Sequence, residues 1–495
     1  MFLGIDVGTS EVKALLLDAS HQQIGAAGAP LTISRPHPGH SEQPPADWWT
    51  ATQLALVNLR QAHPEAYAAV QGIGLSGQMH GAVLLDAQNQ LLRPAILWND
   101  TRASKECEQM MAELPGLAQL AGSLMMPGFT APKLRWLQQH EPARFGQIAK
   151  VLLPKDYVRL QLTGEFVTDM SDASGTGWLD IAGRSWSAAL LKLSGLSVQH
   201  VPRLVEGNQP GGVLTARAAQ ALGLRAGIVV AGGGGDNAAS AVGMGAVEAG
   251  QGFLSLGTSG VLFVVTPSYQ PNPQSATHAF CHAVPGRWHQ MSVMLSAASC
   301  LQWATRLLGA ESEAALEAQA SALTLVQREH APIFLPYLSG ERTPHNNATV
   351  RGSFHNLSHD TTAATLAYAV IEGVTFGLCD GLRALQAAGC EVHRLSLVGG
   401  GARSAMWAQQ LASALNIEIV THTGSASGGA LGAARLAWLA SLAHLGRDTS
   451  PPTNLDTALK EVCVAPAIDY VFTPDAAEQA MLTPRYAQFR ALYAA

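Results

Sequence analysis

The sequence predicts an α/β fold made of two related halves. Short apolar runs with strand-like composition alternate with stretches of helical spacing along the chain. The triplet Gly8-Thr9-Ser10 returns as Gly257-Thr258-Ser259, about half a chain length later in 495 residues. Because a motif repeated at half the chain length indicates a duplicated unit, we expect two related domains.

The composition supports a folded protein that acts on small molecules. Apolar residues make up 47% of the chain and charged residues only 13%, which excludes disorder and favours large buried surfaces. Lys and Arg number 30 against 36 Asp and Glu, for a net charge of −6. This balance offers no basic surface for a nucleic acid, so we expect no nucleic-acid partner.

The sequence also argues against a membrane or secreted protein. Gly, Asp, His or Arg interrupts each apolar run before it reaches the roughly 18 residues that a membrane span needs. The first residues lack the basic segment of a signal peptide and include an acid at Asp6. The six cysteines are scattered without a Cys-x-x-Cys pair. We therefore expect free thiols and a cytoplasmic protein that binds no membrane.

The first element is a β-hairpin around Gly8-Thr9-Ser10. Apolar runs at 2–7 and 12–17 flank the triplet, which predicts strand, tight turn, strand. Nucleotide-binding loops of the P-loop and Rossmann types instead place their glycines between a strand and a helix, and neither motif occurs at these turns. A phosphate bound here would therefore lie on a hairpin.

Four residues of this hairpin are candidates for nucleotide chemistry. The backbone N–H groups and hydroxyls of Thr9 and Ser10 are suitable donors to phosphate oxygens. Asp6, at the end of the first strand, could hold a hydrated Mg²⁺ against the phosphates, or could cap the turn through its own backbone. Lys13 could reach a phosphate or could be a solvated residue at a sheet edge.

Two loops of the first half carry polar groups suited to a small ligand. His80 lies in Ser76-Gly77-Gln78-Met79-His80-Gly81, between two apolar runs, and loops at strand ends are where α/β proteins bind small molecules. Trp98, Asp100 and Arg102 follow in one short segment. Their planar and charged groups suit recognition of hydroxyls, although the same residues could form a surface turn.

Asp236 is the candidate for the reacting group. An apolar run at 228–231 leads into four glycines, 232–235, which suit a backbone that passes close to a ligand. In phosphoryl transfer an Asp accepts the proton of the attacking hydroxyl. Asp236 or Asn237 could instead be the N-cap of the Ala-rich helical stretch that follows. We expect the two domains to meet near the end of that stretch, as 1–244 and 245–495.

The second half repeats the hairpin and adds a third glycine loop. Apolar runs flank Gly257-Thr258-Ser259, and a further run at 395–398 leads into Gly399-Gly400-Gly401-Ala402-Arg403-Ser404. Residues 406–411 that follow have helical spacing. Two hairpins facing each other, with a third glycine loop beside them, could bind a polyphosphate between the domains.

Taken together, these motifs resemble the FGGY carbohydrate kinases. Residues 128–140 are similar to the amino-terminal signature of that family, with Lys133 and Trp136 in register. The segments at 76–81, 97–100, 153–157 and 339–347 and the Asp236-Asn237 loop are similar to those of its bacterial xylulokinases. The resemblance extends from about Phe2 to Trp438.

The resemblance implies two actin/hexokinase-like, ribonuclease H-like domains with a cleft between them. It implies ATP and Mg²⁺ as cofactors and D-xylulose, phosphorylated at its 5-hydroxyl, as the sugar substrate. Asp236 would be the proton acceptor, and Asp6 would act near the metal. The resemblance also assigns residues to the two ligands: Met79, His80, Trp98, Asp100, Arg102 and Asn237 to the sugar; Thr9, Ser10, Lys13, Gly257, Thr258, Gln302, Gly400, Gly401 and Ser404 to the nucleotide.

Other functions stay open at this stage. Another ketose, a polyol such as glycerol, or a sugar acid could be the acceptor, because the sequence specifies the phosphate-binding residues better than the sugar pocket. An actin-like or chaperone-like ATPase uses the same nucleotide motifs, but it would not respond to free sugars. A nucleotide-binding protein without catalysis would leave Asp236 with a structural role. The sequence also leaves a homodimer open.

Overall fold

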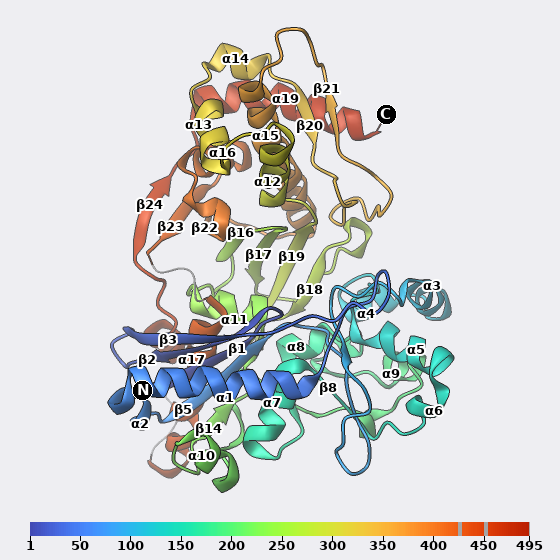
Figure 1. Ribbon diagram of the computed structural model, residues 1–495, viewed down its shortest axis with the longest axis vertical. Helices are drawn as coiled ribbons and strands as arrows, with labels where there is room; N and C mark the ends of the chain where they lie inside the picture. Colours follow the sequence, from blue (N-terminus) through green and yellow to red (C-terminus); the bar gives the residue numbers. More distant parts are fainter. Residues whose placement is uncertain (424–427, 450–453, 495) are drawn as a thin grey trace.

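The computed structural model describes residues 1–423, 428–449 and 454–494. The chain forms two lobes, one above the other in Figure 1, and each lobe contains a seven-stranded sheet. Strands and helices alternate through both lobes, which confirms the predicted α/β class. The amino-terminal half forms most of the lower lobe, and the carboxy-terminal half forms the upper one.

The sheet of the lower lobe is mixed, with its buried strands at the centre. β1 pairs in parallel with β5 and antiparallel with β2. Both β1 and β5 are buried along nearly their whole length, as expected for strands covered by helices on both faces. In order across the sheet the strands are β13 (Pro210–Val213), β14 (Val229–Ala231), β5 (Gly72–Gly77), β1 (Phe2–Val7), β2 (Glu11–Leu17) and β3 (Gln23–Pro30), and β15 (Gly234–Gly235) also pairs with β5.

Helices cover this sheet and form a smaller subdomain at one side of it. The helices up to the middle of the chain are α1 (Pro45–Ala62), α2 (Pro64–Ala68), α3 (Ser104–Glu113), α4 (Leu117–Ala121), α5 (Thr130–His140), α6 (Pro142–Phe145), α7 (Pro154–Thr163), α8 (Met170–Ser174), α9 (Ala188–Leu193), α10 (Ala216–Leu222) and α11 (Asp236–Gly243). α3 to α6 and α9 lie in the subdomain, on the right of the lower lobe in Figure 1.

The upper lobe contains the second sheet and its own helices. Its strands, in order, are β18 (His278–Cys281), β19 (Trp288–Met294), β17 (Gly260–Thr266), β16 (Gly252–Leu256), β22 (Arg394–Val398), β23 (Glu418–His422) and β24 (Ile468–Phe472). The later helices of the chain are α12 (Ala298–Leu307), α13 (Glu313–Ser321), α14 (Leu325–Glu329), α15 (Ala363–Gln386), α16 (Ala405–Leu415), α17 (Gly428–Thr449), α18 (Leu455–Val462) and α19 (Ala476–Ala494).

The two sheets share one motif at their centres. β1 and β2 form an antiparallel hairpin around the first Gly-Thr-Ser, and β16 and β17 form the same hairpin around the second. In each lobe the first hairpin strand also has a parallel neighbour, β5 for β1 and β22 for β16. The predicted strand-turn-strand units and the helix over 406–411 are therefore confirmed.

Helix α17 crosses from the second half of the chain to the first lobe. It follows β23 of the upper sheet in sequence but packs against β1, β5 and α11 of the lower lobe. In Figure 1 this helix, from the red end of the chain, lies with the blue strands of the lower lobe. One helix that packs on the lower sheet therefore comes from the second half of the chain, beginning at residue 428.

Glycine makes this close packing possible. A Cβ atom at Gly4 would lie 1.9 Å from the carbonyl oxygen of Ala430, and one at Gly74 would lie 1.8 Å from that of Ala433. On the other side of α17, a Cβ at Gly432 would lie 1.7 Å from the carbonyl oxygen of Ala239 in α11. Real Cβ atoms do not approach other atoms so closely, so the backbone of the facing element leaves no room for a side chain at any of these three glycines.

One helix has the length and composition of a membrane span. α15 runs for 24 residues, and its most apolar window has a mean hydropathy of 1.2 with 72% of that window buried. Its side chains contribute to the core of the upper lobe, where they pack with those of α12, α13 and α16. Burial in a protein core accounts for the apolar character of this helix.

The α17 packing generates the first prediction. We expect Gly74→Ala to lower the free energy of unfolding by about 1–3 kcal/mol or more, because the added methyl group must displace helix backbone and not a flexible side chain. The melting temperature and the denaturant midpoint measure this change. Gly146→Ala is the control, since Gly146 is exposed and the nearest atom to its added Cβ is 3.5 Å away. Equal stability of the two variants would contradict the packing argument.

Candidate active site

Three neighbouring strand ends bring the two candidate carboxylates together. Asp6 in β1 is the register partner of Ser76 in β5, and Ser76 in turn pairs with Gly234 in β15. These pairings are parallel, so the three strands end at the same edge of the sheet. Asp236 follows β15 directly and is the first residue of α11. The sheet register therefore aligns Asp6 and Asp236 at one edge.

Asp236 has the environment of a proton acceptor. Its Oδ1 accepts hydrogen bonds from the backbone N–H of Asn237 at 2.7 Å and from the side-chain Nδ2 of Asn237 at 3.0 Å. Burial, together with the negative charge of Asp6, raises the pKa of Asp236 to about 6. A carboxylate with this pKa is ionised at neutral pH and is a stronger base than an exposed Asp. Asn237 fixes the orientation of the carboxyl group.

Asp6 is partly buried and has an unused acceptor, its buried Oδ1. Burial raises the pKa of Asp6 above its ordinary value. Within the described residues, neither its Oδ1 nor the hydroxyl of Ser76 beside it has a hydrogen-bond partner. A Cβ at Gly429, in the first turn of α17, would lie 3.0 Å from Asp6 Cγ. The positive end of α17 therefore lies against this carboxylate, which favours negative charge here.

The described residues contain no group of three or more His, Cys, Asp or Glu side chains that could hold a metal ion. A cation at Asp6 would thus need most of its ligands from water and from a bound polyphosphate. Mg²⁺ takes such ligands, since it retains several waters and usually binds one or two carboxylates together with substrate phosphates. The unpaired oxygen of Asp6 fits that donor set.

The glycine run before Asp236 is required by its protein neighbours. Gly233 has φ +80°, and a Cβ there would lie 2.2 Å from the carbonyl oxygen of Leu75. A Cβ at Gly232 would lie 2.3 Å from the carbonyl oxygen of Glu206, and one at Gly235 would lie 2.9 Å from Met79. Close approach of the backbone to other parts of the chain therefore explains the run, whereas the sequence suggested close approach to a ligand.

His80 and Met79 lie beside the Asp236 loop. Met79 is buried against Gly235, the residue before Asp236. His80 Nδ1 lies 2.6 Å from the carbonyl oxygen of Gly175, and the imidazole stacks on Phe129 with ring centroids 4.7 Å apart. Burial lowers the pKa of His80 to about 3, so the ring is neutral. Because a carbonyl only accepts, Nδ1 carries the proton and Nε2 is left as an acceptor for a ligand hydroxyl.

The backbone of His80 is held in an uncommon conformation. Its φ is +72°, in the left-handed region that few non-glycine residues adopt. The carbonyl oxygen of His80 accepts hydrogen bonds from Lys133 Nζ at 2.9 Å and from Thr130 Oγ1 at 3.1 Å. Lys133 is fully buried, and burial lowers its pKa well below the ordinary value. The two donors, both on α5, therefore fix the position of the His80 loop.

Two of the four candidate residues of the first hairpin, Thr9 and Lys13, already have polar partners within the protein. Thr9 Oγ1 lies 3.1 Å from Gln78 Oε1, and the indole N–H of Trp98, a residue 48% exposed, donates to Thr9 Oγ1 at 3.0 Å. Ser10 is exposed. Lys13, opposite Asp6 in the hairpin, forms an ion pair with Glu11 at 2.9 Å and is 44% exposed. Thr9 thus links the hairpin to the loop that carries Met79 and His80.

Asp100 and Arg102 form a buried ion pair. Arg102 Nη2 lies 2.7 Å from Asp100 Oδ2 and 2.7 Å from Glu42 Oε1, and Asp100 also accepts from the backbone N–H of Ser41 at 2.6 Å. The guanidinium carbon lies 5.1 Å from the ring centroid of Trp136. These contacts account structurally for both charges, and contact with a sugar stays a prediction for both residues.

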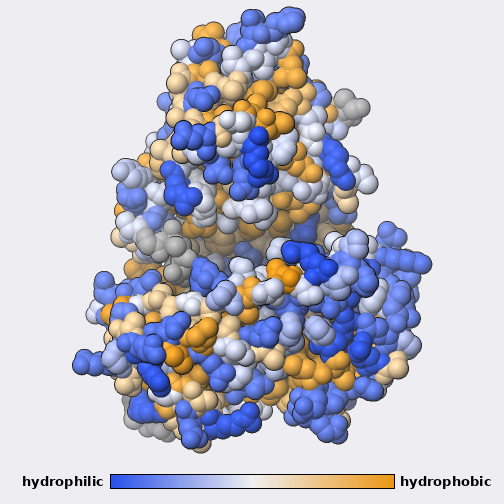
Figure 2. Space-filling model, viewed as in Figure 1, coloured by the Kyte–Doolittle hydropathy of each residue, from blue (hydrophilic) through white to orange (hydrophobic). Residues whose placement is uncertain are grey.

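The upper lobe contains an open pocket of about 510 Å³ at the carboxyl ends of β16 and β22. Six residues predicted to bind the nucleotide line it: Gly257, Thr258, Gln302, Gly400, Gly401 and Ser404. Ser404 is the N-cap of α16 and donates its hydroxyl to Glu317 Oε1 at 2.5 Å. Segments far apart in the sequence thus form one pocket, and Figure 2 shows the surface hollowed where the two lobes meet.

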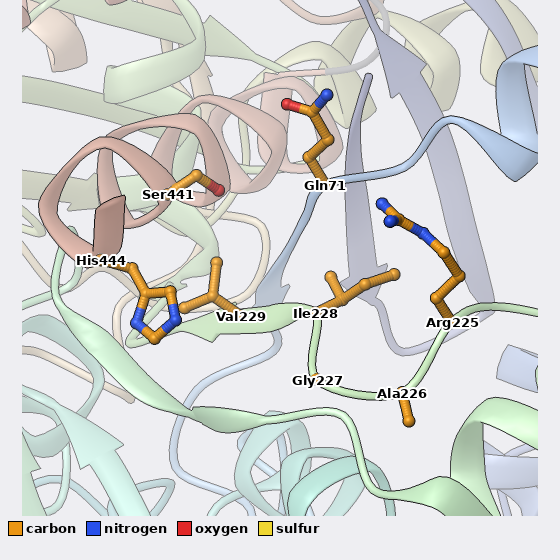
Figure 3. Close-up of a pocket in the computed structure, with 8 residues that line it drawn as sticks. All are labelled: Gln71, Arg225, Ala226, Gly227, Ile228, Val229, Ser441 and His444. Atoms are coloured by element: carbon orange, nitrogen blue, oxygen red, sulfur yellow. The ribbon is translucent and has the colours of Figure 1, made fainter. Parts of the chain in front are cut away.

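Another cavity, of about 380 Å³, lies away from these residues (Figure 3). Gln71, Arg225, Ser441 and His444 line it around Ile228 and Val229. Gln71 precedes β5 and Val229 begins β14, so this cavity lies at the amino ends of the parallel strands. The candidate carboxylates lie at the opposite edge of the sheet, and the cavity belongs to no part of the site described above.

Several residues that support the site escaped sequence reasoning. Gly175 is one, because a Cβ there would lie 2.6 Å from the imidazole of His80. Ser171 is another, since its hydroxyl accepts from the backbone N–H of Gly235 at 3.1 Å. The one available signal was a cluster of small polar residues at 168–176, which resembles any surface turn. Only the tertiary structure relates it to His80 and Asp236.

Comparison with protein families gives two matches. Residues 1–243 match the amino-terminal domain of the FGGY family of carbohydrate kinases, and residues 252–441 match its carboxy-terminal domain. Together they cover most of the chain.

Individual relatives agree with this match. The chain is 49% identical to the xylulose kinase of Escherichia coli (strain K12) over 494 residues, which is 100% of this chain and 98% of the relative. It is 51% identical to that of Klebsiella pneumoniae over 441 residues, 89% of this chain and 90% of the relative. The crystal structure of a xyloylose kinase from Brucella ovis superimposes with a TM-score of 0.94 at 48% identity, covering 99% of this chain and 98% of the other.

The raised pKa of Asp236 generates a stability prediction. The folded pKa of about 6 exceeds the ordinary value of 3.8, so ionisation of Asp236 costs stability above pH 6 and nothing well below pH 3.8. We expect Asp236→Asn to raise the free energy of unfolding at pH 7.5 by about 1–3 kcal/mol, with a smaller gain at pH 5. Thermal unfolding at both pH values measures this. Asp469→Asn, at an exposed position, is the control, and a gain that is independent of pH would contradict the assignment.

Proposed function

The chain belongs to the FGGY family of carbohydrate kinases, and from this we propose that it transfers the γ-phosphate of ATP to the 5-hydroxyl of D-xylulose. The products are D-xylulose 5-phosphate and ADP. Relatives named xylulose kinase that match along the full chain support D-xylulose as the acceptor. One structural observation supports the chemistry above all: a partly buried Asp236, oriented by Asn237, adjoins the Met79-His80 loop at the carboxyl edge of the sheet.

In the proposed reaction Asp236 acts as general base. Its carboxylate accepts the proton of the 5-hydroxyl as that oxygen attacks the γ-phosphorus of ATP. The new P–O bond forms while the bond between the γ-phosphorus and the bridging oxygen of the β-phosphate breaks, and ADP leaves. Positioning supplies much of the rate, because the hydroxyl, the base and the phosphate must lie in line.

We assign the sugar to the lower lobe. Met79, which packs against Gly235, and His80 lie on the loop beside Asp236. The neutral imidazole of His80 offers Nε2 as an acceptor to one sugar hydroxyl. Asn237 is proposed to orient Asp236 and to contact the sugar. Trp98 is exposed enough to contact it as well, whereas Asp100 and Arg102 would act mainly by shaping the loop.

We assign the nucleotide to the hairpins and the upper pocket. The open pocket of the upper lobe is lined by Gly257, Thr258, Gln302, Gly400, Gly401 and Ser404, and we also assign Thr9, Ser10 and Lys13 of the first hairpin to the nucleotide. Asp6, with its buried unpaired oxygen, fits a hydrated Mg²⁺. When bound, that ion would neutralise charge on the phosphates. Cleft closure over the sugar would limit ATP hydrolysis by water.

We also infer that the protein acts in the cytoplasm on small molecules alone, without a membrane or nucleic acid. All six cysteines are free, as the sequence predicted, and the structure buries them; free thiols fit a reducing compartment. The association of two copies into a dimer stays a prediction.

An assay of ADP release with MgATP over ketoses, polyols and sugar acids tests the function. We expect D-xylulose to give the highest kcat/KM and ATP turnover without sugar to be slow. A higher kcat/KM for L-ribulose, L-fuculose, glycerol or gluconate would show that D-xylulose is not the preferred acceptor, although the protein would still be a carbohydrate kinase. Turnover that no sugar stimulates would instead favour an ATPase.

Replacing Asp236 tests the general base. We expect Asp236→Ala to reduce kcat below about one per cent of the wild-type value while ATP binding, measured by calorimetry, persists. The wild-type kcat should also fall as the pH drops through about 6, because the protonated carboxyl cannot accept the hydroxyl proton. A variant that retains more than a few per cent of wild-type kcat would rule out this role.

Replacing His80 tests sugar recognition. We expect His80→Ala to raise the KM for D-xylulose about 10- to 100-fold, through loss of a hydrogen bond and a stacked ring, and to leave the KM for ATP nearly unchanged. Steady-state kinetics in both substrates measure the two effects. His330→Ala, at an exposed position, serves as the control. An unchanged kcat/KM for the ketose would count against the assignment.

A further inference from the structure

A cluster of buried charges lies behind the Asp236 loop. Lys155 Nζ lies 2.7 Å from Asp156 Oδ1, 2.8 Å from Asp169 Oδ1 and 3.0 Å from Asp172 Oδ2. Arg159, one turn further along α7, lies 3.8 Å from Asp156. All five side chains are fully buried. We refer to these five residues as the Lys155 cluster.

Stability alone does not explain this cluster. Removing five charged groups from water is costly, and packed apolar side chains of similar volume are often equally stable in such places. The cluster holds three carboxyl groups and two cations, and burial raises the pKa of Asp172 well above its ordinary value. The role of the cluster can therefore be sought in the other hydrogen bonds that its members make, which reach other parts of the chain.

Arg159 makes the first connection to the Asp236 loop. Its guanidinium donates hydrogen bonds to the carbonyl oxygens of Ala231 and, at 2.5 Å, of Gly232. Ala231 immediately precedes the glycine run that leads to Asp236, and Gly232 is the first residue of that run. Since glycine leaves a backbone free to rotate, hydrogen bonds from a rigid planar group are an effective way to fix its path.

Asp169 makes the second connection through Ser171. The hydroxyl of Ser171 donates to Asp169 Oδ2 at 2.5 Å, and the backbone N–H of Gly235 donates to the same hydroxyl at 3.1 Å. A hydroxyl has one proton, so the acceptor Asp169 sets its direction and leaves a lone pair for Gly235. The residue immediately before Asp236 is thereby joined to the Lys155 cluster.

The same short helix also supports His80. Asp169 is the N-cap of α8, and Gly175, whose carbonyl oxygen accepts from His80 Nδ1, is its C-cap. Displacement of α8 would therefore move the acceptor of His80 together with the acceptor of Gly235.

We propose that the Lys155 cluster is a positioning element for phosphoryl transfer, which aligns Asp236 through Arg159 and Ser171 and aligns His80 through α8. This inference rests on the proposed roles of Asp236 and His80. The five residues touch neither substrate and act through the two loops.

Ser171→Ala is the mildest test, because it removes one hydroxyl and leaves every charge in place. We expect kcat with D-xylulose to fall about tenfold while the KM for ATP stays within about twofold. The stoichiometry of ADP binding gives the concentration of folded sites, and kcat is calculated per folded site. Deuterium exchange at the Gly235 amide should accelerate. Ser441→Ala, which removes a buried hydroxyl bonded within α17, is the matched control and should change neither value.

Asp169→Asn provides the second variant. We expect it to lower kcat and, through α8, to raise the KM for D-xylulose, whereas Ser171→Ala affects kcat alone. Because both substitutions act on Gly235 through one hydroxyl, their effects on kcat should be non-additive: Asp169→Asn should lower kcat by a smaller factor when Ser171 is already Ala.

The outcomes separate this inference from the proposed function. Wild-type kcat in Ser171→Ala, or fully additive effects in the double variant, would overturn the positioning role. If Asp169→Asn fails to fold, Ser171→Ala alone decides. A wild-type protein that is inactive on D-xylulose would contradict the proposed function, and in that case unchanged exchange at Gly235 in Ser171→Ala would still overturn the positioning role.

Discussion

The contact between α17 and the lower sheet is the constraint on which the cleft depends. This helix belongs by sequence to the second half, yet Gly4, Gly74 and Gly432 allow it to pack directly on β1, β5 and α11. The contact places side chains from the second half of the chain in the core of the lower lobe. It also brings the first turn of α17 against Asp6, so the packing of the fold and the electrostatics of the site have the same origin.

The parallel register of β1, β5 and β15 aligns the candidate active-site residues. It brings Asp6 and Asp236 to one edge, where the charge of Asp6 raises the cost of ionising Asp236. Two hydrogen bonds from Asn237 partly offset this cost and orient the carboxyl group of Asp236. Burial thus produces a stronger base at a cost in stability, as is common at catalytic sites.

Much of this could be predicted from the sequence, and the rest could not for identifiable reasons. The two Gly-Thr-Ser hairpins, the glycine loop at 399–401 and Asp236 stand out because each lies at a boundary between an apolar run and a turn. The return of α17 to the first lobe is a long-range contact that local periodicity does not encode. Asp100 and Arg102 suggested a ligand, but they pair with each other, and Arg102 also pairs with Glu42, 60 residues earlier in the sequence, which no local motif reveals. Gly175 acts through its backbone carbonyl, and Ser171 acts through a hydroxyl that accepts from the backbone N–H of Gly235; neither long-range contact can be inferred from residue identity.

The position of the transferred phosphate tests the central claim most directly. A ¹H–³¹P correlation spectrum, recorded while the protein reacts with MgATP and D-xylulose, reports which carbon of the sugar bears the phosphate ester. We expect one new phosphorus resonance that appears at the rate of ADP formation and correlates with the C5 methylene protons; coupling of these protons to H4 distinguishes them from the C1 methylene protons, which lie beside a carbon without a proton. An ester at another carbon, or inorganic phosphate released in proportion to ADP, would contradict in-line attack by the 5-hydroxyl under the control of Asp236.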